Sequence, residues 1–67
     1  MKNPGKIVEL CDCRKGIIYT KQQRHPSKIT VHLIDNDYLP VLSEKTGSQA
    51  MVFVTADKIR RIIGYVD

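Results

Sequence analysis

The apolar residues of this chain occur in short runs with a two-residue period, and no run follows the 3.6-residue period of an amphipathic helix. The clearest run is KITVHLID at residues 28–35, in which Ile29, Val31 and Leu33 alternate with polar residues. This alternation is typical of a strand with one buried face. Because the chain has only 67 residues, all of its runs must share one small core. The sequence therefore predicts a single all-β domain over residues 1–67.

Turn residues divide the chain into five or six expected strands. We predict strands at residues 6–13, 17–22, 28–35, 38–42, 50–55 and 62–66. Gly16 is expected to supply a positive φ in a tight turn at residues 14–16, and Pro40 limits residues 38–42 to an edge or a bulge. Residues 43–49 are expected to form a loop, and Thr55 or Asp57 to cap one helical turn over residues 56–60.

This order of elements resembles the small SH3-like β-barrels, in which a strongly bent sheet closes on itself and a 3₁₀ turn precedes the final strand. The opening KIVELCDCRKGIIY is similar to the KOW element of ribosomal proteins and transcription elongation factors, with Cys11, Asp12 and Cys13 where that element has its first glycine. The RKGIIY opening and the IGYVD ending also resemble those of short bacterial proteins of unknown function. The resemblance implies an SH3-like barrel of five or six antiparallel strands in a bacterial protein.

Positive charge is concentrated in the first part of the chain. The net charge is +4, and residues 1–28 hold seven Lys and Arg residues against two acidic residues. Residues 29–45 hold one Lys against three acidic residues. A one-sided field of this kind favours RNA, DNA or an acidic protein surface as the partner, whereas a solvated surface kept for solubility is the alternative.

Nucleic-acid binding is the specific function that this basic region favours. Its cations are placed to contact phosphates, and Tyr19 lies among them, where it can stack on a base. Arg60 and Arg61 join the region if the last strand pairs with the first. The predicted nucleic-acid-binding residues are Lys6, Arg14, Lys15, Tyr19, Lys21, Arg24, His25, Arg60 and Arg61.

A protein-interaction or assembly module is the alternative function. Residues 38–42 can present a strand edge, with Pro40 limiting uncontrolled pairing. Residues 50–54 are apolar on both faces, which predicts a strand buried within the fold. They also leave more apolar surface than one small barrel can hide, which indicates a homodimer.

Metal binding and catalysis are not supported by the motifs present. Cys11 and Cys13 with His25 or His32 would be the only zinc candidates, but structural zinc sites usually draw on two paired clusters, and this chain has one pair at the wrong spacing. Neither a phosphate-binding glycine loop nor a catalytic motif occurs. The sequence predicts a non-enzymatic protein without metal or cofactor.

Membrane insertion and export are also not indicated. The apolar runs are only a few residues long, far below the roughly 20 residues that span a bilayer. The first six residues, MKNPGK, do not begin an export signal. We therefore expect a cytoplasmic protein with reduced thiols and no membrane partner.

Overall fold

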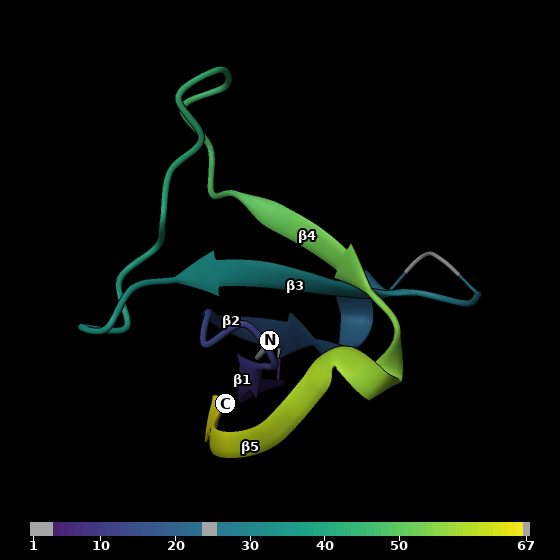
Figure 1. Ribbon diagram of the computed structural model, residues 1–67. Coiled ribbons are helices and arrows are strands. Elements are labelled where there is room, and N and C mark those ends of the chain that lie inside the picture. Colours follow the sequence, from purple (N-terminus) through teal and green to yellow (C-terminus); the bar gives the residue numbers. More distant parts are fainter. Residues whose placement is uncertain (1–3, 24–25, 67) are drawn as a thin grey trace.

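The computed structural model describes residues 4–23 and 26–66, which fold into one antiparallel five-stranded sheet (Figure 1). Its strands are β1 (Gly5–Leu10), β2 (Lys15–Tyr19), β3 (Ile29–Ile34), β4 (Met51–Val54) and β5 (Ile59–Val66). Two 3₁₀ turns, η1 (Thr20–Gln22) and η2 (Ala56–Lys58), follow β2 and precede β5. The all-β class and the helical turn before the last strand are confirmed.

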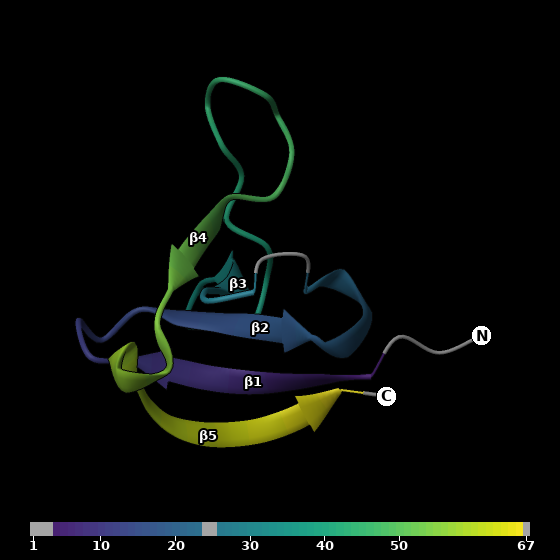
Figure 2. The ribbon, with the colours of Figure 1, turned by 90° about the vertical axis from the view of Figure 1, so that its right-hand side faces the viewer.

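The sheet is bent but not closed. Its strand order is β4-β3-β2-β1-β5, so that β4 and β5 form its two edges. Two register shifts interrupt the pairing of β1 with β5, between Ile7 and Val8 and between Glu9 and Leu10. Bulges of this kind bend a strand and increase its twist, and β5 curves along the sheet in Figure 2. The arrangement is compatible with an SH3-like fold whose two edge strands stay apart.

A small aliphatic core lies on the concave face of the bent sheet. Val8, Leu10 and Val31 are at most 3% exposed, as the alternation in their runs predicts. Partly buried residues from β2, β3, β4 and β5 pack against these three side chains: Ile18, Ile29, Val52, Val54 and Ile59. Burying one aliphatic side chain of this size stabilises a fold by roughly 1.5–3 kcal/mol. The core therefore depends on contributions from all five strands.

The side-chain amide of Gln23 fixes the start of β3. Its Oε1 accepts a hydrogen bond from the backbone N–H of Thr30 (2.9 Å), and its Nε2 donates to the carbonyl of Thr30 (3.1 Å). The same Nε2 donates to the carbonyl of Tyr19 (3.2 Å). These bonds join the end of β2 to β3.

The predicted turn at Gly16 is wrong, because Gly16 lies within β2. The residue with positive φ in the β1–β2 turn is Cys13 (φ 73°). A Cβ at Gly16 would overlap Cγ1 of Val31 and lie 2.9 Å from the carbonyl oxygen of His32. Glycine is needed here because β3 passes too close for a side chain.

Residues 38–42 do not form the predicted strand. They make isolated bridges, Ile34 with Pro40 and Leu42 with Gln49, and belong to an arm of residues 35–50 that projects from the sheet (Figures 1 and 2). The side chain of Asp35 stabilises the turn at the start of the arm. Its Oδ1 accepts hydrogen bonds from the backbone N–H groups of Asp37 (2.8 Å) and Leu39 (3.0 Å).

Strand β4 is not buried on both faces as predicted, because it is an edge strand. Val52 and Val54 pack against the core, whereas Met51 and Phe53 are 50% and 58% exposed. Strand β5 begins at Ile59, three residues earlier than predicted, because Ile59 pairs with Leu10. Thr55 occupies the N-cap position of η2, but its hydroxyl bonds to Oδ1 of Asp57 and not to the backbone.

Candidate nucleic-acid interface

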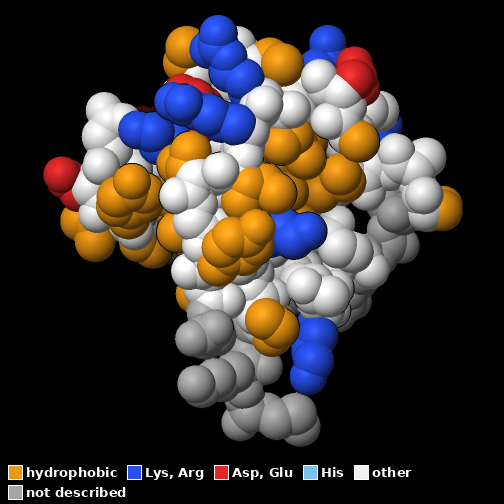
Figure 3. All heavy atoms as spheres, turned by 90° about the horizontal axis from the view of Figure 1, so that it is seen from below, with side chains coloured by type: hydrophobic (Ala, Val, Ile, Leu, Met, Phe, Trp, Pro, Cys, Tyr) orange, Lys and Arg blue, Asp and Glu red, His pale blue; other side chains and the backbone are white. Residues whose placement is uncertain are grey.

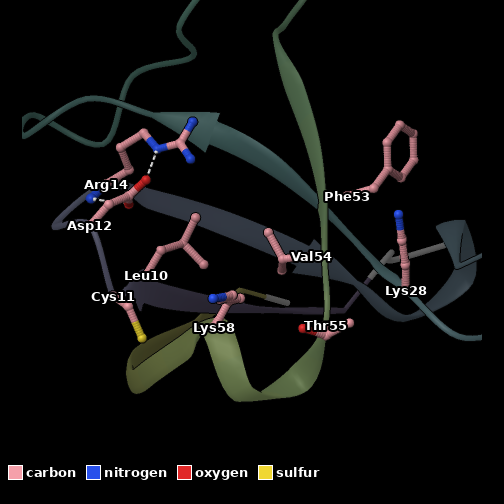
Figure 4. A pocket seen from close by; sticks show the side chains of 9 residues that line it. All are labelled: Leu10, Cys11, Asp12, Arg14, Lys28, Phe53, Val54, Thr55 and Lys58. Atoms are coloured by element: carbon pink, nitrogen blue, oxygen red, sulfur yellow. Dashed lines mark hydrogen bonds and ion pairs between the residues drawn. The ribbon is translucent and has the colours of Figure 1, made fainter.

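An open pocket of about 570 Å³ lies between the β1–β2 turn, the residue before β3, and the segment from β4 to η2 (Figure 4). The apolar side chains of Leu10, which is only 3% exposed, and Val54 lie at its base. Three cations from different parts of the chain line it, namely Arg14, Lys28 and Lys58. We call this site the basic pocket. It brings together charges that are 14 to 44 residues apart in the sequence.

Arg14 is oriented by Asp12 within the β1–β2 turn. Oδ1 of Asp12 accepts a hydrogen bond from the backbone N–H of Arg14 (3.2 Å), and Nε of Arg14 donates to Oδ2 of Asp12 (2.6 Å). The backbone hydrogen bond from Arg14 and the nearby guanidinium lower the pKa of Asp12. Asp12 also lines the pocket. The lining therefore holds three cations and one carboxylate, which is paired with Arg14.

Lys58 is positioned by contacts between η2 and the end of β1. The carbonyl of Lys58 accepts a hydrogen bond from the backbone N–H of Cys11 (2.9 Å), and the thiol of Cys11 lies 3.6 Å from the carbonyl oxygen of Asp57. The hydrogen bond from the hydroxyl of Thr55 lowers the pKa of Asp57. These contacts fix the wall of the pocket that carries Lys58.

Phe53 lines the basic pocket, and its exposed ring lies on the side of β4 away from Val54. It lies on β4 opposite Thr30, and Figure 4 shows it with Lys28 at one end of the pocket, while Asp12 and Arg14 lie at the other. Sequence reasoning missed Phe53 because an apolar run was interpreted as a buried strand. Lys28 was counted among the cations of the basic region but not among the predicted binding residues, and Lys58 was in neither group.

The predicted binding residues do not gather in one place. Among those that the structure describes, Arg14 is the one that lines the basic pocket. Nζ of Lys15 donates to Oδ1 of Asn36 (3.1 Å), and Nε of Arg61 donates to Oε1 of Glu9 (2.8 Å). Arg60 is exposed on β5, and Lys21 is exposed in η1. Arg24 and His25 lie outside the described residues.

Tyr19 and His32 contact each other. Their ring centroids lie 5.1 Å apart in an edge-to-face arrangement, and Tyr19 is partly buried. Nε2 of His32 is buried and has no hydrogen-bond partner within residues 4–23 and 26–66. Burial lowers the pKa of His32, so its imidazole is neutral at pH 7.

Lys6 lines a second, mainly apolar groove of about 340 Å³ on the concave side of the sheet. Val8, Ile18 and Ile62 contribute to this groove. On the β5 side of the molecule, hydrophobic side chains gather near the centre with Lys and Arg side chains among them and around them (Figure 3). Lys6 therefore belongs to a different surface from Arg14.

Metal ligands do not cluster in the described part of the chain. No group of three or more His, Cys, Asp or Glu residues there is arranged to hold a metal ion. Cys11 and Cys13 are free and exposed. Within the same residues, no helix has the length and apolar character needed to cross a bilayer.

Comparison with known proteins finds no relative of this chain. Compared with protein-family models, with curated proteins and with solved structures, this chain gives no match. The KOW-like opening and a bacterial origin stay predictions.

Proposed function

We propose that the protein binds single-stranded RNA or DNA at the basic pocket. The observation that carries this is the exposed ring of Phe53 in the same pocket as Arg14, Lys28 and Lys58. Proteins that bind single strands combine cations that follow the phosphates with aromatic rings on which bases stack. An open apolar pocket with cations around it supplies both kinds of contact.

Single strands are favoured over duplexes by the aromatic ring. A base can stack on Phe53 only when its face is free, and bases inside a duplex are already stacked on their neighbours. Tyr19 is a weaker platform than Phe53 because its ring is partly buried against His32. We propose binding without catalysis and without a cofactor, in a cytoplasmic protein.

Fluorescence anisotropy with a labelled ten-nucleotide RNA, the same DNA sequence and its duplex tests this function. We expect the two single strands to bind more tightly than the duplex at about 50 mM salt. The double variant Lys28→Ala/Lys58→Ala should weaken binding at least tenfold. Lys45→Ala is the matched control, because Lys45 is an exposed cation in the arm. Equal losses in the double variant and the control, or no binding by the unmodified protein, would disprove the assignment.

A protein-interaction or assembly module is the second candidate function. The observation in its favour is the arm, where Leu39 and Leu42 are 58% and 61% exposed. Two solvent-exposed leucines three residues apart in one hydrogen-bonded segment favour a protein partner. Substituting both leucines by serine should leave oligonucleotide affinity within about twofold while removing such an interaction.

A further inference from the structure

The arm presents apolar side chains in a fixed conformation. Tyr38, Leu39 and Leu42 are all more than half exposed, although the backbone around them is hydrogen bonded. The N–H of Val41 donates to the carbonyl of Leu33 (3.1 Å), and the N–H of Ala50 donates to the carbonyl of Val41 (2.7 Å). The arm is therefore a built hairpin that projects from the sheet, where another molecule can reach it (Figures 1 and 2).

The charge of the arm is opposite to that of the rest of the chain. Residues 35–50 contain Asp35, Asp37 and Glu44 against Lys45, a net charge of −2, while the whole chain carries +4. The remaining residues thus carry +6. The basic pocket combines positive charge with apolar surface from Phe53 and Val54, whereas the arm combines negative charge with exposed leucines. The two surfaces are complementary in both respects.

We propose that two copies of this chain form a twofold dimer in which the arm of each copy lies in the basic pocket of the other. This inference deepens the second candidate function and rests on it. A second copy is the partner that the charges favour, because one chain carries both complementary surfaces and a reciprocal contact satisfies both pairs at once. Contact between two arms is disfavoured because both are acidic.

The contact would cover the exposed apolar side chains of the arm. They are Tyr38, Leu39, Val41 and Leu42. Burying such side chains adds a hydrophobic contribution to the attraction between opposite charges.

A charge-exchange experiment in sedimentation velocity tests the arrangement. One variant, Asp37→Lys/Glu44→Lys, makes the arm basic, and the other, Lys28→Glu/Lys58→Glu, makes the pocket acidic. The unmodified protein should be dimeric at about 100 μM and dissociate as salt is raised. Each variant alone should dimerise at least tenfold more weakly, because its arm and pocket carry like charge. An equimolar mixture should form a heterodimer, since both contacts are then between opposite charges.

A matched pair of variants tests the apolar part of the contact. Leu42→Ser should weaken the dimer, whereas Tyr65→Ser should not, although Tyr65 is 74% exposed on β5. Circular dichroism checks that every variant is folded.

Three results would overturn the dimer. They are an unmodified protein that is monomeric at 100 μM, a dimer that persists in the Lys28→Glu/Lys58→Glu variant, and a mixture that stays monomeric. A monomer that binds another protein through Leu39 and Leu42 overturns the dimer but keeps the second candidate function. A monomer that binds oligonucleotide overturns the dimer but leaves the proposed nucleic-acid binding standing. A dimer that binds no oligonucleotide supports the dimer and overturns the proposed nucleic-acid binding.

Discussion

The salt dependence of oligonucleotide binding can be calculated from the cations of the basic pocket. For single strands, the logarithm of the association constant falls with the logarithm of the salt concentration with a slope of about −0.7 per phosphate neutralised. Arg14, Lys28 and Lys58 line the pocket, which gives a slope of about −2 if each contacts one phosphate. Raising the salt from about 50 to about 200 mM should therefore weaken binding roughly 20-fold.

Removing two of these cations changes the slope as well as the affinity. In Lys28→Ala/Lys58→Ala only Arg14 remains, so the slope should fall to about −0.7 and the same salt step should cost only about threefold. Anisotropy titrations at four salt concentrations measure both slopes, with Lys45→Ala as the control. A double variant that keeps the full slope would show that phosphates are bound elsewhere, for example near Lys6 or Arg60, and would refute the assignment to this pocket.

Three further predictions concern single residues. Gly16→Ala should destabilise the fold by about 1–3 kcal/mol in urea unfolding, because its Cβ would overlap the buried Val31. Gly64→Ala is the tolerated control, because its Cβ would lie 3.4 Å from Cδ1 of Ile7. Phe53→Ala should cost about 1–3 kcal/mol of oligonucleotide affinity through lost stacking without changing the salt slope, and a changed slope would argue against stacking. The pKa of His32 is lowered in the folded protein, so near and below pH 6.5, the ordinary pKa of histidine, the unfolded chain binds more protons than the folded chain. The free energy of unfolding should therefore fall as the pH drops from 7.5 to 5.5. His32→Gln should remove this fall, and an unchanged profile in that variant would assign it to another group.

Alternation of apolar residues predicted the strands that surround the core. Val8, Leu10 and Val31 are buried as their runs indicate, because a strand with one covered face repeats every two residues. The same rule failed at β4, since an apolar run cannot tell a buried strand from an edge strand with one open face. Phe53 was missed for this reason. Gly16 was misplaced because turn propensity and close packing of neighbouring strands both select glycine, and only the position of Val31 distinguishes the two.

The binding residues were harder to predict than the strands. A run of cations in the sequence does not show on which face of a sheet each side chain lies. Lys6 lies at the concave groove, Arg61 pairs with Glu9, and Arg14 alone of these three reaches the basic pocket. Lys58 comes from the other end of the chain, and its place beside Cys11 follows from the pairing of β5 with β1. That pairing was expected, but its register was not.

Nucleic acid and self-association use the same cations, and this makes the two proposals dependent on each other. If the arm of one copy lies against Lys28 and Lys58, a bound strand and a bound arm exclude each other, and each must weaken the other by the same factor. Adding the ten-nucleotide RNA to the dimer should then release monomers that each carry one strand, with the monomer fraction rising as the RNA is titrated. Variants with a basic arm, Asp37→Lys/Glu44→Lys, should bind RNA more tightly than the unmodified protein at high protein concentration, because no arm competes for the pocket. A complex of two chains and two strands in sedimentation velocity would contradict this exclusion, and it would place the dimer contact outside the basic pocket.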